Sequence, residues 1–423
     1  METLRLGSRG PNVKLIQSLL NRIGYNAGGV DGIFGTQTQR AVIAFQRDNG
    51  LTPDGIVGPA TWRVFNRLLL GYDTYTVRQG DTLYNIASRY YTTVNAILTA
   101  NPGINPNALA IGQRIIVPYG IDIVFTDIDY TYEILERQIT GLKVRYPFIE
   151  TSVIGESVMG KNIYCIRLGT GPNEVTYNAS HHANEWITTT LLMKFIENFA
   201  KAYANRSSIR GYNVSNIWQN SSIYIIPMVN PDGVDLVNYW PNYNNPVYQQ
   251  AAAINTTGLP LPRVWKANIR GVDLNSNYPA DWELDRELKA QMGITGPSPR
   301  DWGGPFPLSE PESSAMANFT RQHNFRLVIA YHTQGEVIYY QYRNLAPPES
   351  LRIAQMFARA SGYAVEEGPP EASYAGYKDW FIQDFRRPGF TIEVGLGVNP
   401  LPISQFPTIY DRNEEIMLLA PIV

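Results

Sequence analysis

The feature that most constrains the fold is the alternation of strand-like and helical runs between residues 122 and 423. Short apolar runs such as NIYCIRLG, EVTYNAS, RLVIAYHT and FTIEVG are separated by longer segments with helical periodicity. This alternation is typical of α/β domains, in which helices cover a parallel or mixed sheet. Roughly 300 residues can bury a large core and still leave room for a deep active site. We therefore expect a large α/β domain with a mixed sheet at residues 121–423.

Two shorter segments precede this domain, and the composition of the whole chain is that of a globular protein. The 423 residues are 44% hydrophobic and 17% charged, and the formal net charge is −2. These values exclude a wholly disordered chain, and the lack of dense basic clusters argues against a nucleic-acid binder. No apolar run approaches the roughly 18–20 residues that a membrane helix needs. The one cysteine, Cys165, permits no intramolecular disulfide and gives no sign of an oxidising compartment.

The first segment, residues 1–71, predicts a small three-helix domain with an internal duplication. Apolar residues share one helical face in NVKLIQSLLNRIG, and two further helices are expected in TQTQRAVIAFQRDNG and PATWRVFNRLL. The phrase DGIFGTQT, which starts at Asp31, recurs as DGIVGPAT, which starts at Asp54. This segment resembles the peptidoglycan-binding domain attached to bacterial wall hydrolases. The resemblance implies a shallow groove for the wall polymer.

The second segment, residues 72–120, predicts a β-α-α-β unit. A strand at Tyr75–Val77 is followed by a helix capped at Asp81 and Thr82, by a second helix capped at Thr93, and by a second strand that ends at Val117. The sequence of these elements favours a small domain separate from the large α/β domain.

Several short stretches make this second segment resemble a LysM domain, notably Gly80–Leu83, Asn101-Pro102 and Ile115–Pro118. LysM domains bind glycans that contain N-acetylglucosamine, in a groove between the first strand–helix loop and the second helix–strand loop. The resemblance places that groove at Gly80–Leu83 and at Pro106–Ile111.

A candidate metal site follows from two of the four histidines in the chain. His182 lies three residues before Glu185, where the strand EVTYNAS ends and a helix begins, and His332 ends a second strand, RLVIAYHT. Ligands bind at the carboxyl ends of strands in open α/β sheets. Two histidines and one carboxylate form the catalytic type of zinc site, with a fourth position open for water. His181 is set aside because its partner three residues on is Asn184, a poor ligand, so we expect one Zn²⁺ at the other three residues.

A candidate general base lies on a third strand, GFTIEVG, as Glu393. An acid on an apolar strand is costly to bury unless it has a partner or a function. Beside a metal-activated water, Glu393 would accept a proton and later give it to the leaving amine. The alternative is a buried salt bridge between Glu393 and Arg386 or Arg387.

Residues 121–423 resemble the zinc carboxypeptidase family of the funnelin type. The motifs occur in the order that the family shows: His182-x-x-Glu185, IIPMVNPDG from Ile225, RGVDLN from Arg270, the strand-terminal His332, Asp379-Trp380, and TIEVG with Glu393. The resemblance implies that two histidines and one glutamate hold Zn²⁺ while a separate glutamate is the catalytic base.

The same resemblance implies further roles around the metal. An arginine stabilises the oxyanion in this family, and Arg270 is our first choice for that role, with Lys266 second. A mobile tyrosine closes on the substrate, and Tyr374 fits better than Tyr377. The family also uses the text DLNRN to bind the terminal carboxylate of its substrate.

One departure from this family concerns the carboxylate clamp. This chain has Asp273-Leu274-Asn275-Ser276-Asn277, so Asn275 is kept while Ser276 replaces the arginine. We assign Asn275, Ser276 and Tyr374 to substrate binding. Loss of a bidentate carboxylate clamp weakens the case for an ordinary C-terminal exopeptidase, but it leaves zinc hydrolysis intact.

Two wall-binding modules before a zinc peptidase predict a peptidoglycan peptidase that acts on glycan strands and stem peptides. The architecture is similar to murein endopeptidases of spore-forming bacteria, which cut the bond between D-glutamate and diaminopimelate. The alternatives are an LD-carboxypeptidase that trims murein peptides and a non-catalytic wall-binding protein. The N-terminus, METLRLGSRG, has no apolar core and no small-residue cleavage site. We therefore expect no signal peptide, and synthesis in a cytoplasm or forespore before the protein acts on the wall in sporulation.

Overall fold

A computed structural model describes residues 2–241, 244–368 and 374–423. The chain forms two compact units. The first contains the residues up to 129 together with 133–150 and 197–207, and the second contains residues 130–132, 151–196 and 208–423. Among the described residues, every helix is too short or too polar to cross a bilayer.

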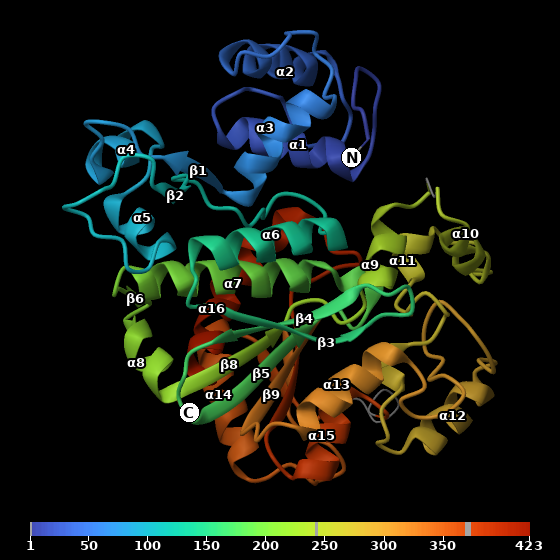
Figure 1. Ribbon diagram of the computed structural model, residues 1–423. Coiled ribbons are helices and arrows are strands. Elements are labelled where there is room, and N and C mark those ends of the chain that lie inside the picture. Colours follow the sequence, from blue (N-terminus) through green and yellow to red (C-terminus); the bar gives the residue numbers. More distant parts are fainter. Residues whose placement is uncertain (1, 242–243, 369–373) are drawn as a thin grey trace. The chain divides into compact units, whose positions relative to one another are not determined.

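The N-terminal part of the first unit contains the expected three helices, labelled in Figure 1. They are α1 (Pro11–Arg22), α2 (Thr36–Asp48) and α3 (Pro59–Leu70). Their apolar faces form a small core that includes Leu19, Phe45 and Phe65. The rings of Phe45 and Phe65 stack with centroids 4.4 Å apart.

The internal duplication is visible in two buried glutamines. The side-chain amide of Gln17 donates to Asp31 Oδ1, to the carbonyl of Ile33 and to Thr38 Oγ1, and its carbonyl accepts from the amide of Gly32. Gln46 makes the same four bonds in the second copy of the repeat. Its partners there are Asp54, Ile56, Thr61 and Gly55. The repeat thus holds each turn to a helix through one buried amide.

The expected β-α-α-β unit follows. It consists of β1 (Tyr72–Thr76), α4 (Leu83–Arg89), α5 (Val94–Ala100) and β2 (Arg114–Pro118), with β1 and β2 antiparallel. Thr82 caps α4 by accepting from the amide of Asn85, and Thr93 caps α5 by accepting from the amide of Ala96. Both caps agree with the sequence prediction.

The second unit is built on an eight-stranded mixed sheet, as the alternation of the sequence predicts. The strand order is β11-β10-β12-β9-β5-β8-β4-β3. The strands are β3 (Glu150–Glu156), β4 (Asn162–Leu168), β5 (Asn173–Ala179), β8 (Ser221–Ile226), β9 (Leu327–His332), β10 (Val337–Tyr339), β11 (Ala364–Glu366) and β12 (Gly389–Glu393). The central neighbours β12, β9, β5 and β8 run parallel, whereas β10 is antiparallel to β12 and β4 is antiparallel to β8.

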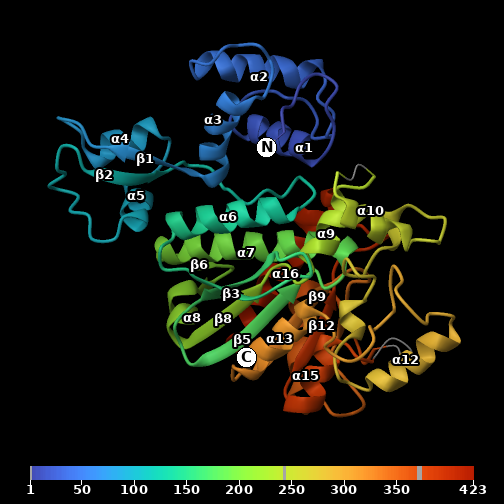
Figure 2. The same ribbon diagram turned by 45° about the vertical axis from the view of Figure 1, so that its right-hand side comes forward.

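Helices cover both faces of this sheet. Figure 1 shows α13 (Pro311–Arg321) and α15 (Tyr377–Phe385) on one face, and α14 (Glu349–Ser361) and α16 (Phe406–Leu419) on the other. Figure 2 shows α13, α15 and α16 again from another side. Alternate side chains of β9 point to opposite faces of the sheet. Val328 and Ala330 point to the face covered by α13 and α15 and pack in the core cluster there. The remaining helices are α6 (Tyr132–Arg145), α7 (Ile187–Ala204), α8 (Val214–Asn220), α9 (Pro231–Asn238), α10 (Pro246–Ala253), α11 (Leu261–Val264) and α12 (Trp282–Gln291), and a short hairpin is formed by β6 (Ser208–Ile209) and β7 (Tyr212–Asn213).

The strand register brings the predicted site residues to one edge of the sheet. β5 and β9 are adjacent and parallel, and Ala179 of β5 is paired with Tyr331 of β9. β9 and β12 are also adjacent and parallel, and His332 is paired with Glu393. The ends of all three strands therefore meet at the same place.

Candidate active site

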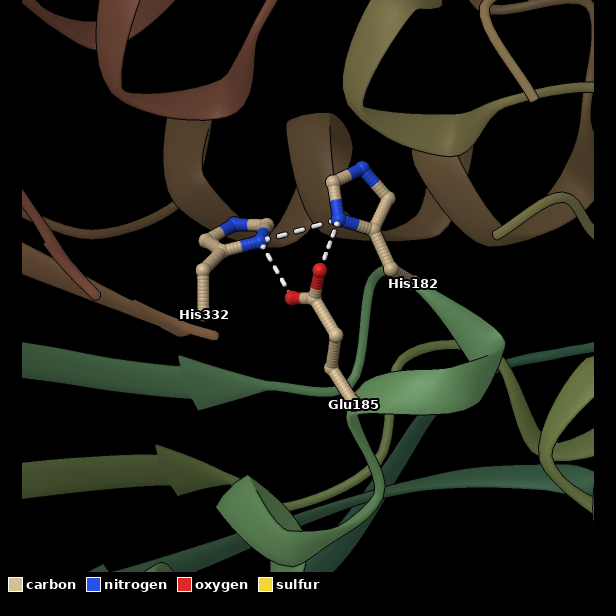
Figure 3. A group of neighbouring side chains, drawn as sticks. All are labelled: His182, Glu185 and His332. Atoms are coloured by element: carbon tan, nitrogen blue, oxygen red, sulfur yellow. Dashed lines mark hydrogen bonds and ion pairs between the residues drawn. The ribbon is translucent and has the colours of Figure 1, made fainter. Parts of the chain in front are cut away.

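Two adjacent strand ends position the three predicted metal ligands, which Figure 3 shows facing one another. His182 follows β5, Glu185 ends the short 3-10 helix η1 (Ala183–Glu185), and His332 is the last residue of β9. His182 Nδ1 lies 2.9 Å from Glu185 Oε1, and His332 Nδ1 lies 3.0 Å from Glu185 Oε2. The two Nδ1 atoms are 3.2 Å apart. Ligand atoms from distant parts of the chain thus converge on one point.

The turn after β5 is made by Ser180, whose φ of 52° lies in the left-handed region. Two threonines of the first turn of α7 stabilise this backbone. The amide of Ser180 donates to Thr188 Oγ1 at 3.1 Å, and its hydroxyl lies 2.8 Å from Thr189 Oγ1. A non-glycine residue in this conformation persists only where its surroundings hold it. The bonds therefore direct His182 and Glu185 away from the strand and toward His332.

The three residues fit a zinc ion. Atoms about 2.1 Å from a tetrahedral ion are about 3.4 Å apart, within about 0.5 Å of the three separations given above. All three side chains are buried, and their donor set, two imidazoles and one carboxylate, is the set of catalytic zinc sites with an open fourth position. His182, Glu185 and His332 could therefore hold one zinc ion.

A second layer of contacts orients these ligands. Asp273 Oδ1 lies 3.2 Å from His182 Nε2, so the ring nitrogen that faces away from the site has an acidic partner. The carboxylate of Glu185 accepts from the amide of Thr333 at 3.1 Å and from Asn399 Nδ2 at 3.3 Å. Contacts of this kind fix the orientation of metal ligands and the tautomer of a ligating histidine.

The electrostatics of the site favour positive charge at its centre. Burial alone would lower the pKa of His182, but the negative charges of Glu185 and Asp273 raise this pKa to about 9. Burial alone would raise the pKa of Glu185, yet His182 and Lys266 hold it well below its usual range. The carboxylate of Glu185 therefore stays charged although it is buried, and a pocket with a buried negative charge is suited to a cation.

Glu393 faces the same site from β12. Among the described residues, its Oε2 atom has no hydrogen-bond partner although it is buried. Removal from water, together with the negative charge of Glu185, raises the pKa of Glu393 to about 8. The alternative of a salt bridge is not what the structure shows, because Arg387 donates to the carbonyl of Phe325 and to Asn324, and no ion pair joins Arg386 to Glu393 in the described ranges.

A cavity of about 530 Å³ opens beside the three ligands. It is lined mostly by polar and charged side chains, among them Asn184, Arg263, Lys266, Asn275, Arg300, Thr333, Gln334, Lys378, Asp379, Glu393 and Asn399. A space of this size is typical of small-molecule and peptide sites. Its lining contains four cationic residues, which suits an anionic substrate.

The structure places the second choice for the oxyanion cation, and not the first, in this cavity. Arg270 is 54% exposed and its guanidinium lies 3.5 Å from Glu310, outside the lining. Lys266 lines the cavity, and its Nζ lies 3.0 Å from Glu185 Oε1. Burial alone would lower the pKa of Lys266, but the carboxylates of Glu185 and Glu393 raise it, so the ammonium keeps its charge. The structure therefore places Lys266 at the cavity and Arg270 outside its lining, and the choice of cation for the oxyanion stays a prediction.

The predicted substrate-binding residues are only partly brought together. Asn275 lines the cavity, and its Oδ1 accepts from the amide of Tyr377. Ser276 does not line it, and its side chain is buried. Tyr374 also lies outside the lining, with its ring under the guanidinium of Arg343 at 5.4 Å.

Tyr377, the second choice for the mobile tyrosine, is a core residue. Its side chain is fully buried and its hydroxyl lies 2.9 Å from Thr320 Oγ1. His181 is likewise buried, with Nε2 2.9 Å from the hydroxyl of Tyr278. Both therefore stabilise the fold beside the site.

Several residues of the site had no role in the sequence prediction. Asp273, Thr333 and Asn399 hold the ligands, and Arg300 and Lys378 line the cavity. Asp273 belongs to the RGVDLN motif, so its position was a usable signal, whereas a single basic residue, such as Arg300 in a loop or Lys378 in α15, gives none. The roles of all these residues depend on contacts between segments that are far apart in the sequence.

Comparison with known proteins agrees with this geometry. Residues 135–415 match the zinc carboxypeptidase family (peptidase M14), residues 9–65 match a peptidoglycan binding domain, and residues 75–118 match the LysM domain. The γ-D-glutamyl-L-diamino acid endopeptidase 1 of Lysinibacillus sphaericus is 45% identical over 394 residues, an alignment that covers 81% of this chain and 98% of the relative.

More distant matches show the extent of the similarity. An uncharacterized protein of Bacillus subtilis is 37% identical over 290 residues, covering 68% of this chain and 76% of that protein. The solved structure of bovine thrombin-activatable fibrinolysis inhibitor, in complex with tick carboxypeptidase inhibitor, superposes with a TM-score of 0.53 at 20% identity, covering 70% of this chain and 97% of the other, and so shows the shared fold. With its eight-stranded sheet and its His-Glu-His site, this chain belongs to the zinc carboxypeptidase family, and it joins that catalytic domain to peptidoglycan-binding and LysM domains.

Proposed function

We propose that this protein is a zinc-dependent peptidoglycan peptidase that hydrolyses the bond between γ-D-glutamate and diaminopimelate in murein stem peptides. The observation that supports it most is the convergence of three ligand atoms and a free carboxylate, Glu393, at neighbouring strand ends beside one cavity. The bond specificity is supported by the 45% identity to an endopeptidase named for that bond.

In this mechanism, His182, Glu185 and His332 would hold one zinc ion per chain. Zinc, when bound, supplies Lewis-acid chemistry that polarises the scissile carbonyl and makes water more acidic. The carboxylate of Glu393 accepts a proton from the attacking water and passes it to the leaving amine. The ammonium of Lys266 stabilises the negative charge that develops on the carbonyl oxygen.

The two N-terminal modules support a substrate in the cell wall. Each would bind glycan strands weakly, and their linkage raises the effective concentration of the peptidase at the polymer. The place of synthesis that we propose is the cytoplasm or forespore, with action on the wall during sporulation. The free, buried Cys165 is compatible with a reducing compartment. Fractionation of sporulating cells with an antibody to the chain tests this location.

Digestion of defined stem peptides, followed by mass spectrometry, tests the proposed reaction. The zinc-loaded protein is expected to release L-alanyl-D-glutamate, with its γ-carboxyl freed, and a fragment that begins with diaminopimelate. Release of a single terminal residue would instead identify an LD-carboxypeptidase, and no cleavage by the zinc-loaded protein would identify a binding protein. The His182→Ala variant is expected to contain less zinc than the His323→Ala control, which changes a histidine outside the site.

A further inference from the structure

The loop that contains Arg300 lies directly against the segment of the catalytic lysine. The backbone amides of Lys266 and Ala267 both donate to the carbonyl of Pro299, at 2.8 and 3.0 Å. The carbonyl of Lys266 in turn accepts from the amide of Ala183, which lies between His182 and Glu185 in the sequence. Three separate stretches of chain are thus joined side by side, and Arg300, which follows Pro299, lines the same cavity as Lys266.

The guanidinium of Arg300 is held in one orientation, but only part of its hydrogen-bonding capacity is taken up. Its Nε donates to Asp301 Oδ2 at 2.7 Å, and the amide of Asp301 is itself bonded to Asp273 Oδ2 at 3.0 Å. The two terminal nitrogens have no acceptor among the described residues, and the side chain is 54% exposed. A guanidinium held through Nε presents its other edge as a fork that matches a carboxylate.

The charge at this edge of the cavity also remains positive. Asp301 is shared, because Lys289 Nζ lies 3.7 Å from its other oxygen. At another part of the lining, Lys378 has a partner of its own in Asp379, at 2.6 Å, and it donates to the carbonyl of Gln341. Arg300 is therefore the oriented cation beside Lys266 that the proposed mechanism does not use.

The chemistry of the proposed substrate supplies an anion for this place. In a γ-linked glutamate the side-chain carboxyl forms the scissile amide, so the α-carboxylate stays free on the acyl side, four bonds from the scissile carbonyl carbon. The oxygen of that carbonyl faces Lys266 in the proposed mechanism. A group that lines the cavity beside Lys266 is therefore within reach of this carboxylate.

We propose that Arg300 is a specificity-determining residue that binds the free α-carboxylate of the γ-linked D-glutamyl residue, through the open edge of its guanidinium. This inference rests on the proposed function. It assigns to Arg300 the recognition of a carboxylate on the acyl side of the bond, at a place distinct from Ser276, where the family has its arginine for a terminal carboxylate.

The experiment combines one change in the enzyme with one change in the substrate. The zinc-loaded wild type and the Arg300→Gln variant are each given L-alanyl-γ-D-glutamyl-diaminopimelate and the same peptide with the D-glutamyl α-carboxylate converted to a carboxamide. The value of kcat/KM is measured for all four combinations. Arg270→Gln is the matched control, because Arg270 has the same 54% exposure but lies outside the cavity.

The wild type is expected to prefer the free acid by about tenfold or more, as a charge-assisted hydrogen bond implies. In Arg300→Gln this preference should fall to within about twofold, through slower cleavage of the acid alone, while Arg270→Gln keeps it. Arg300→Lys should retain part of the preference, which separates loss of charge from loss of folding. Zinc content and thermal melting of each variant are measured alongside.

Failure of the inference and failure of the proposed function give different results. Equal cleavage of both peptides by the wild type overturns the role of Arg300 but leaves the endopeptidase intact. An unchanged preference in Arg300→Gln also overturns the assignment to Arg300. If the zinc-loaded wild type cleaves neither peptide, the proposed function fails and the inference fails with it.

Discussion

Replacement of Asp273 by asparagine is expected to weaken zinc binding without removing any metal ligand. The carboxylate of Asp273 accepts from three donors. Oδ1 lies 3.2 Å from His182 Nε2 and 3.1 Å from the amide of Asn275, and Oδ2 lies 3.0 Å from the amide of Asp301. An asparagine has one acceptor oxygen, so its NH₂ group must face at least one of these donors.

The size of the effect follows from this count. If the amide oxygen stays with His182 and Asn275, the backbone N–H of Asp301 loses its acceptor inside the protein, which costs about 1–3 kcal/mol. The bond to His182 also loses its charge assistance, and a neutral partner no longer stabilises the imidazole as a ligand. Changes at such orienting residues typically reduce metal affinity by about 10–100-fold. We expect a loss in that range, with a similar loss of kcat/KM at limiting zinc.

A competition titration against a zinc chelator with an optical signal measures this affinity at fixed pH. The control is Asp285→Asn, which changes another buried aspartate that, among the described residues, has no hydrogen bond to a predicted metal ligand. Circular dichroism checks that both variants fold. Wild-type zinc affinity in Asp273→Asn would refute the view that Asp273 orients His182.

Three further changes test other parts of the site and the fold. Glu393→Gln should retain zinc but lose at least about 100-fold in kcat, and near-normal turnover would exclude Glu393 as the base. Lys266→Met should lower kcat by about 100–1,000-fold at unchanged zinc content, because it removes the oxyanion cation, whereas an intact kcat would assign that role elsewhere. Burial raises the pKa of Glu312 from 4.5 to about 7. The folded state thus keeps a proton that the unfolded chain releases, and the free energy of unfolding should fall by up to about 3 kcal/mol between pH 4.5 and 7. Glu312→Gln should remove this contribution to the pH dependence of the free energy of unfolding. If that free energy changes equally with pH in the wild type and in the variant, Glu312 does not have the raised pKa.

Much of the architecture was predictable because its signals are local. The repeated DGIxG phrase, the caps at Thr82 and Thr93 and the apolar strands of the α/β domain each follow from a few neighbouring residues. The placement of His182, Glu185 and His332 was predictable as well, since parallel strands expose their carboxyl ends at one edge of the sheet.

The rest of the site depends on distances along the chain that no local pattern encodes. The choice between Arg270 and Lys266 is decided by which side chain the loop turns toward the cavity. Tyr377 is the first residue of α15 and is buried, whereas Tyr374 precedes the helix and is partly exposed. Their sequence contexts are alike, so the sequence does not reveal this difference in burial. Arg300 is brought to the cavity by its neighbour Pro299, whose carbonyl accepts from the amide of Lys266, and a lone basic residue in a polar loop gives no sign of such a bond.

The matched glutamines of the N-terminal helical module give that module an internal reference. Gln17 and Gln46 each tie one turn to one helix by bonds of the same kind, so the same substitution can be made twice in one molecule. Any difference between the two outcomes must come from what surrounds each copy and not from the amide itself. Such a comparison, with the wild-type chain as the reference, would separate effects on the stability of the module from effects on its binding to peptidoglycan.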